Sequence, residues 1–239
     1  MKIKYKNMHI SDYITNFRNL ENTLKFQNCI IICILVFSVL FFVSCVNDDY
    51  NYDDVDENAK PVIYLYPKKE TKLSVILDYS GVLTCTYPEY NGIWKVLAKP
   101  DGTLTNIEDG KEYSYLFWEG LADIDYNFSE GFVVKGEDTK DFLQEKLAYM
   151  GLTPREYNEF IVYWLPKMQG NKYNLISFQG ENYTENAKLL ITPKPDSILR
   201  VYMAYKAIDK PIQIKEQVLD PFKRNGFTVV EWGGTEINN

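Results

Sequence analysis

An unbroken apolar run from Cys29 to Val46 constrains this chain more than any other feature of its sequence. A helix of this length spans about 27 Å, which is enough to cross a thin hydrocarbon core. Basic residues outnumber acidic ones before the run, and the residues that follow it are strongly acidic. This asymmetry predicts that the N-terminus stays in the cytoplasm and that everything after Val46 lies outside.

The end of the apolar run predicts how the protein is anchored. Phe42-Val43-Ser44-Cys45 resembles the lipobox of bacterial lipoproteins, in which a signal peptidase cuts before the cysteine and that cysteine receives the lipid. The resemblance implies that residues 1–44 are a signal peptide and that Cys45 is the lipidated first residue. An uncleaved N-terminal membrane anchor is the alternative. Under either interpretation the membrane is a partner, and the protein is located at the cell membrane with its domain outside the cytoplasm.

The rest of the chain divides into a tether and one domain. Residues 45–59 are acidic and have no hydrophobic period, so they cannot bury enough surface to offset their chain entropy. We expect them to form a disordered tether. Residues 60–239 are long enough to bury one sizeable core, and we expect them to form a single folded domain.

Charge and histidine content exclude several functions. The chain has 26 basic and 33 acidic side chains, and most of its excess negative charge lies beyond the apolar run. This balance argues against nucleic acid as a partner. The one histidine, His9, precedes the apolar run, so the domain has no Ser-His-Asp or Cys-His nucleophile and no histidine-ligated metal. No phosphate-binding loop, Cys-x-x-Cys pair or EF-hand pattern occurs, so we expect no cofactor and no metal site.

Alternating hydrophobic residues between turn signals predict strands in the first and last thirds of the domain. The expected strands are Pro61–Pro67, Leu73–Tyr79, Val82–Tyr87, Ile93–Ala98, Glu112–Glu119, Phe132–Lys135, Lys172–Phe178, Lys188–Thr192, Leu199–Ile208, Ile212–Val218 and Phe227–Trp232. A short helix is expected from Asp220-Pro221 to Asn225-Gly226. Cys85 shares parity with Leu83 and Tyr87 and is expected to be a buried structural cysteine.

The hydrophobic period changes from 2 to 3.6 in the middle of the domain. Leu143, Leu147 and Met150 fall on one helical face, and Thr153-Pro154-Arg155-Glu156 is a capping box that starts a second helix. We expect that helix to end at Pro166. The pattern predicts an α+β fold, with mostly antiparallel β structure (a sandwich or a curved sheet) and a helical hairpin at about 138–166 packed on it.

Four segments resemble an uncharacterised family of bacterial secreted or surface-anchored proteins, which are predicted lipoproteins. They are Lys60–Pro67, Tyr113–Gly120 (with Phe-Trp-Glu-Gly), Val162–Pro166 and Gly226–Gly234 (with Val-Glu-Trp-Gly-Gly). The resemblance covers most of residues 60–239. It supports the extracytoplasmic location and the single domain, and it implies no activity and no catalytic residue.

Glu119 and Glu231 are the candidate catalytic residues. Each is placed at the end of an expected strand, beside a tryptophan and before glycine, on a face that is otherwise apolar. An apolar setting raises the pKa of a carboxyl group, and two such groups across an aromatic cleft would suit polysaccharide cleavage. The alternative is that both are structural glutamates, satisfied by tyrosine hydroxyls or backbone N–H groups.

Trp94, Trp118 and Trp232 are the candidate binding residues, because flat aromatic faces suit sugar rings and protein surfaces. Burial in the core is the alternative for each. The leading functional hypothesis is a membrane-anchored surface module that binds a glycan or an envelope protein without catalysis. The alternatives are a histidine-free hydrolase of polysaccharide and a purely structural envelope component.

Overall fold

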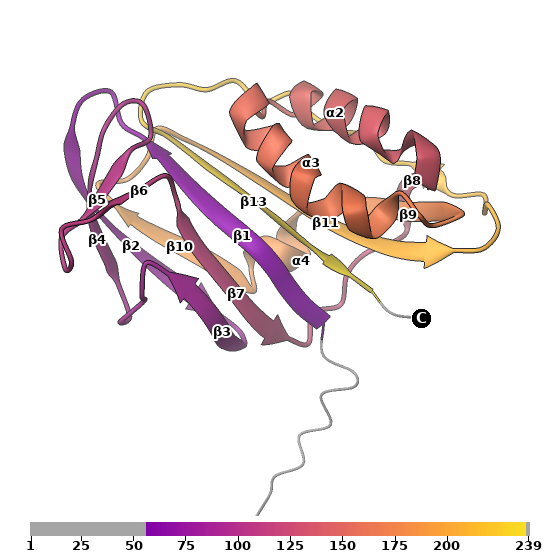
Figure 1. Ribbon diagram of the computed structural model, residues 1–239, viewed down its shortest axis with the longest axis horizontal. Coiled ribbons are helices and arrows are strands. Elements are labelled where there is room, and N and C mark those ends of the chain that lie inside the picture. Colours follow the sequence, from indigo (N-terminus) through magenta and orange to yellow (C-terminus); the bar gives the residue numbers. More distant parts are fainter. Residues whose placement is uncertain (1–55, 238–239) are drawn as a thin grey trace, which may run out of the picture. The chain divides into compact units, whose positions relative to one another are not determined.

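A mixed sheet of eight strands forms the middle layer of the domain in a computed structural model that describes residues 56–237 (Figure 1). In spatial order the strands are β12 (Lys215–Glu216), β8 (Glu130–Lys135), β9 (Tyr173–Gln179), β11 (Ser197–Ile208), β13 (Thr228–Glu236), β1 (Asp56–Tyr66), β7 (Leu116–Ala122) and β3 (Val82–Tyr87). Neighbouring strands are antiparallel except for the parallel pairs β11–β13 and β12–β8.

A second, smaller sheet covers one face of the large one. It is entirely antiparallel, and its strands in order are β10 (Ala187–Thr192), β2 (Thr71–Tyr79), β4 (Trp94–Ala98), β5 (Leu104–Asn106) and β6 (Glu112–Tyr113). The alternating burial of β2 sends Leu73, Val75 and Leu77 into the space between the sheets. This inter-sheet core follows from the two-residue period of a strand.

Two helices cover the opposite face of the large sheet (Figure 1). After a 3₁₀ turn, η2 (Gly136–Asp138), the chain forms α2 (Thr139–Tyr149) and then α3 (Pro154–Met168). Glu156 accepts a hydrogen bond from the backbone N–H of Thr153 at 2.7 Å, as the capping box predicts. A short helix, α4 (Glu181–Thr184), precedes β10.

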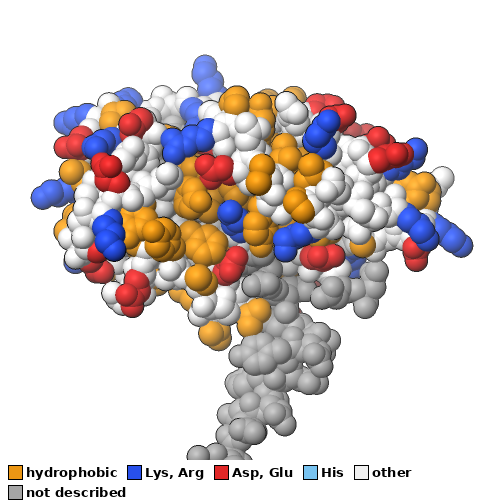
Figure 2. Space-filling model, viewed as in Figure 1, with side chains coloured by type: hydrophobic (Ala, Val, Ile, Leu, Met, Phe, Trp, Pro, Cys, Tyr) orange, Lys and Arg blue, Asp and Glu red, His pale blue; other side chains and the backbone are white. Residues whose placement is uncertain are grey.

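The central strands therefore supply two cores at once. In β1, Ile63 and Leu65 belong to the inter-sheet core, whereas Val62 and Tyr64 belong to the core beneath the helices. The prediction of a mostly antiparallel α+β fold with a helical hairpin near 138–166 is confirmed. On the face shown in Figure 2, hydrophobic side chains are exposed among acidic and basic ones.

Several local predictions were wrong. Strand β1 starts at Asp56, five residues before the strand expected from Pro61. Helix α3 continues through Pro166 to Met168, because a proline in the last turn removes only one backbone hydrogen bond. Residues 220–225 form no helix; within this segment Arg224 donates hydrogen bonds to the Gly151 carbonyl and to Glu156. Strand β5 was missed.

Cys85 is exposed, not buried as predicted. It lies on β3, which forms one edge of the large sheet and whose pairing with β7 shifts register between Leu83 and Cys85. A bulge of this kind breaks the parity on which the prediction rested, because two residues of one strand oppose one of its partner.

Candidate functional site

Glu231, one of the two candidate catalytic residues, is part of a buried ion pair. It lies in the middle of β13, not at a strand end, and its side chain is 1% exposed. Arg200 stands directly opposite on β11, and its Nε donates a hydrogen bond to Glu231 Oε2 at 2.6 Å. Trp118 Nε1 donates to the other carboxylate oxygen at 3.4 Å. Both acceptor oxygens are thus held by structural partners, which favours the structural alternative.

The ion pair is packed against aromatic rings between the two sheets. The guanidinium carbon of Arg200 lies 4.9 Å from the centre of the Tyr183 ring. Burial raises the pKa of Tyr183 well above its usual value, and the negative charge of Glu231 adds to the shift. A ligand would have to part the two sheets to reach this carboxylate, because neither Glu231 nor Tyr183 has appreciable surface exposure.

Glu119 does not converge with Glu231. It is the fourth residue of β7, a strand that continues through Gly120 to Ala122. Within β7, Trp118 belongs to the inter-sheet core and Phe117 packs beneath the helices, so strand alternation places Glu119 on the helix side. Glu231 lies on the opposite face, toward Trp118. The large sheet therefore separates the two carboxylates that a paired mechanism would need together.

The candidate binding tryptophans are core residues. Trp94 is 1% exposed, and Trp118 and Trp232 are fully buried. Trp94 and Trp118 lie between the sheets, whereas Trp232 packs against Phe160 of α3 with ring centres 5.3 Å apart. None of these rings offers a face for a sugar or a protein partner, so the core alternative holds for all three. Cys45, the predicted lipidation site, lies outside the described residues.

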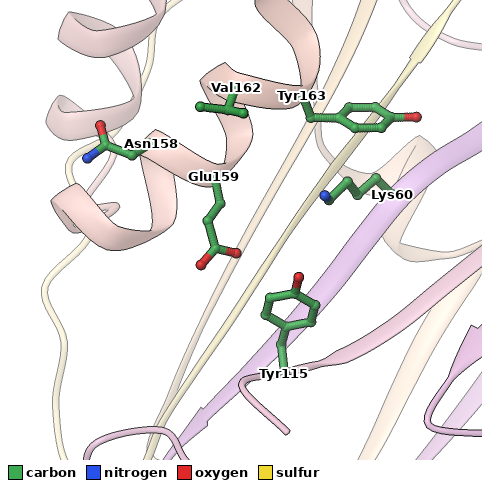
Figure 3. Close-up of a pocket in the computed structure, with 6 residues that line it drawn as sticks. All are labelled: Lys60, Tyr115, Asn158, Glu159, Val162 and Tyr163. Atoms are coloured by element: carbon green, nitrogen blue, oxygen red, sulfur yellow. The ribbon is translucent and has the colours of Figure 1, made fainter.

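The structure instead forms a pocket where α3 meets β1 and the start of β7 (Figure 3). Its volume is about 380 Å³, near the lower end of the range for small-molecule sites. The residues that line it are Lys60, Tyr115, Asn158, Glu159, Val162 and Tyr163. Within the described part of the chain, no group of three or more His, Cys, Asp or Glu side chains is arranged to hold a metal ion.

Lys60 reaches the pocket because β1 carries a bulge at its start. The registers of β1 with both β13 and β7 shift just before Val62, so β1 has one extra residue there. Lys60 adopts φ 54°, a left-handed conformation that costs a non-glycine residue of order 1–3 kcal/mol. Its ammonium group lies 5.1 Å from the centre of the Tyr163 ring. The fold holds Lys60 in a strained conformation at the pocket.

Helix α3 supplies the opposite wall. Asn158, Glu159, Val162 and Tyr163 follow one another at helical spacing along one flank of α3, where Glu159 and Tyr163 still contact the core beneath the helix. Glu156, Phe160 and Trp164 on its other side are buried and fix the helix in place. Because these buried side chains hold α3 on the sheet, the helix residues that line the pocket are already in place before a ligand binds.

Hydrogen bonding gives the pocket fixed donors and acceptors. The hydroxyl of Tyr64 donates to Glu159 Oε2 at 2.7 Å. Burial raises the pKa of Tyr64, and the bond to Glu159 raises it further. Burial and the negative charge of Glu159 also raise the pKa of Tyr115, against a smaller opposing effect of Arg155. Both phenols therefore stay protonated at neutral pH: Tyr64 donates its proton to Glu159, and Tyr115 offers a hydroxyl donor to the pocket.

In Figure 3 the hydroxyl of Tyr115, the carboxylate of Glu159 and the ammonium group of Lys60 point toward a common space. The ring of Tyr163 lies beside Lys60, with its hydroxyl directed away. The arrangement offers cationic and phenolic donors, carboxylate and amide acceptors, and aromatic surface. It suits a polar ligand that is held by several directed hydrogen bonds.

No catalytic or binding motif marks these residues in the sequence, although a weaker signal is present. Three of the four segments that carry the family resemblance contribute to the pocket: Lys60–Pro67 supplies Lys60, Tyr113–Gly120 supplies Tyr115, and Val162–Pro166 supplies Val162 and Tyr163. Segments far apart in the chain thus converge here. The fourth, Gly226–Gly234, places Trp232 beneath α3.

Fold and pocket together define an α+β domain of two packed sheets with a tyrosine-lined polar pocket beside its helical hairpin. A protein of Butyrivibrio fibrisolvens, described as an uncharacterized protein in the bglA 3′ region, is 49% identical over 67 residues, which cover 27% of this chain and 68% of that protein. The chain belongs to the same family as that protein. No family model and no solved structure matches the chain. No helix within residues 56–237 is long and apolar enough to cross a membrane.

Proposed function

We propose that the protein is a membrane-anchored, extracytoplasmic binding module that recognises a glycan without cleaving it. The observation that carries the proposal is the preformed pocket between α3 and β1, with Tyr115, Lys60 and Glu159 directed into it. Sugars present hydroxyl groups that both donate and accept, together with C–H faces that pack on aromatic rings. The donors, acceptors and tyrosine rings of this pocket match both properties.

Binding is favoured over hydrolysis by the positions of the carboxylates. Glycoside hydrolysis needs two carboxyl groups about 5–10 Å apart across the scissile bond. Glu231 is neutralised by Arg200 between the sheets, and strand alternation directs Glu119 to the other face. Among the described lining residues of the pocket, Glu159 is the only carboxylate. No observation favours the hydrolase alternative.

The glycan proposal predicts a loss of affinity for the glycan when a side chain that lines the pocket is removed. Tyr115→Ala should weaken binding about tenfold or more, equivalent to about 1.4 kcal/mol, because both a ring surface and a hydroxyl donor are lost. Tyr115→Phe should weaken it only a few-fold, since one hydrogen bond contributes about 1 kcal/mol. Hits from an array of bacterial envelope glycans and soluble polysaccharides would be titrated by calorimetry with the full-length protein in detergent.

The matched control is Tyr149→Ala, which removes a 53% exposed tyrosine from α2, outside this pocket. It should leave affinity unchanged. Thermal melting of each variant separates lost binding from lost folding. The proposal fails if no glycan on the array binds, or if Tyr115→Ala and Tyr149→Ala bind as tightly as the wild type.

The anchor is tested separately through Cys45. Cys45→Ala should abolish lipid attachment, because the lipobox resemblance assigns the lipid to this cysteine, while the uncleaved apolar run keeps the protein in the detergent phase of a cloud-point partition. A gel shift relative to the wild type reports the missing lipid. Cys33→Ala, which alters a cysteine inside the apolar run, should behave as the wild type. Anchoring without a gel shift in Cys45→Ala would favour the uncleaved helix.

A further inference from the structure

A second concave surface lies on the far side of the helical hairpin from the α3–β1 pocket. A groove of about 1090 Å³ runs between β8, α2 and residues 211–216. A smaller pocket of about 470 Å³ adjoins it along residues 216–219 and shares Phe132, Glu145, Lys146 and Glu216. The apolar side chains of the groove include Phe132, Phe142 and Ile212, and Ile212 is 50% exposed. Its size and lining suit an extended chain better than a small molecule.

One wall of this groove is the edge of the large sheet. Strand β12 pairs with β8 only at Glu130 and Gly131. Between Phe132 and Lys135, β8 pairs with β9 on one side and with no strand on the other within the described residues. Five consecutive residues of β8 line the groove. Only every second residue of a strand would line a groove on one face of the sheet, so this pattern indicates that the groove runs along the edge of β8. Such an edge can accept an additional strand.

The charge of the groove indicates which kind of peptide segment could add to the edge of β8. Its acidic lining residues are Asp138, Asp141, Glu145 and Glu216. Its two lysines are already engaged: Lys135 pairs with Glu137 at 3.6 Å, and Lys146 pairs with Glu145 at 3.3 Å while lying over the Phe132 ring. Asp141 is paired as well, with Lys140 at 3.1 Å, so Asp138 and Glu216 are the lining acids that form no ion pair within the described residues. The lining therefore keeps an excess of negative charge beside apolar surface.

We propose that this groove, which we call the β8 groove, binds an extended segment of a partner protein in which basic and apolar residues alternate. The segment adds a strand to the open edge of β8. Its apolar side chains face Phe142 and Ile212, and its basic side chains face Asp138, just before α2, and Glu216 on the opposite wall. This interaction is independent of the glycan pocket and gives the module a protein partner at the envelope.

Two labelled peptides test the proposal with the full-length protein in detergent. A ten-residue peptide of alternating Lys and Val should bind at least tenfold more tightly than one of alternating Glu and Val, as measured by fluorescence anisotropy. The double variant Asp138→Asn/Glu216→Gln should weaken the binding of the Lys-Val peptide about tenfold. Hydrogen exchange of the amides at 132–135 should slow when that peptide binds, because strand addition engages backbone N–H groups.

The control double variant is Glu89→Gln/Glu108→Gln, which removes the same charge from exposed positions outside the groove. It should change affinity less than twofold, and Tyr115→Ala should leave peptide binding unchanged. An equal loss in both double variants would overturn the proposal in favour of non-specific attraction to an acidic protein. Unchanged exchange at 132–135 on binding would exclude strand addition. Protection of these amides that grows with protein concentration in the absence of peptide would assign the groove to a second copy of the chain instead.

Discussion

Glu231→Gln should lower the free energy of unfolding by about 3–5 kcal/mol, because it leaves Arg200 as a buried cation without its counter-charge. The Arg200 side chain is 10% exposed and its guanidinium packs against Tyr183, so water has little access as a substitute partner. Urea denaturation of the wild type and the variant measures this difference directly. The size of the effect reflects the desolvation cost of an unpaired charge between two sheets.

The double variant Glu231→Leu/Arg200→Met is the matched control. Replacing both members of a buried ion pair by apolar residues of similar size is often neutral or stabilising, so this variant should recover most of the stability lost by Glu231→Gln. Recovery would identify Glu231 as structural. A Glu231→Gln protein that melts like the wild type but loses an activity would instead revive the catalytic hypothesis.

Trp232→Ala should destabilise the domain by about 3–5 kcal/mol, the usual cost of truncating a fully buried aromatic residue. Trp232 is 0% exposed and packs edge-on against Phe160, so the variant leaves a cavity between β13 and α3. The same denaturation experiment measures the change. Because Trp232 was a candidate binding residue, the result also decides between a structural and a surface role.

Tyr149→Ala serves again as the comparison, since truncation of an exposed side chain usually changes stability by less than about 0.5 kcal/mol. If Trp232→Ala cost no more than Tyr149→Ala, the placement of Trp232 beneath α3 would be wrong. A large loss of stability in Trp232→Ala alone agrees with the core position.

The helical hairpin shows what local sequence signals can predict. The apolar spacing of Phe160 and Trp164 and the capping box at Thr153 depend on residues within a turn or two of one another. Such local signals do not depend on how the helix packs against the rest of the protein. Most strands were predicted for the same reason, since alternation within β2 or β11 is also local.

The candidate site could not be predicted in the same way. In the sequence, Glu231 has no charged partner on its apolar strand face. Its partner, Arg200, comes from β11, and the parallel register that pairs β11 with β13 depends on contacts between residues far apart in the chain. For Trp94 and Trp118 the sequence left burial and surface exposure both open, because a second sheet has to pack over them before they are buried. Lys60 and Tyr163 meet only because a bulge in β1 lies opposite α3.

The sequence by itself determined the elements with internal periodicity, the α+β class, and the predictions about the membrane that rest on residues 1–46. Tertiary structure alone decided which face of each strand is covered, which charges neutralise one another and where a pocket remains. The physical reason is that a period reports which residues of one element lie together, whereas burial and ion pairing depend on the element that packs against them. Glu231 and Glu119 illustrate this, because similar local sequence places one between two sheets and the other on the helix side.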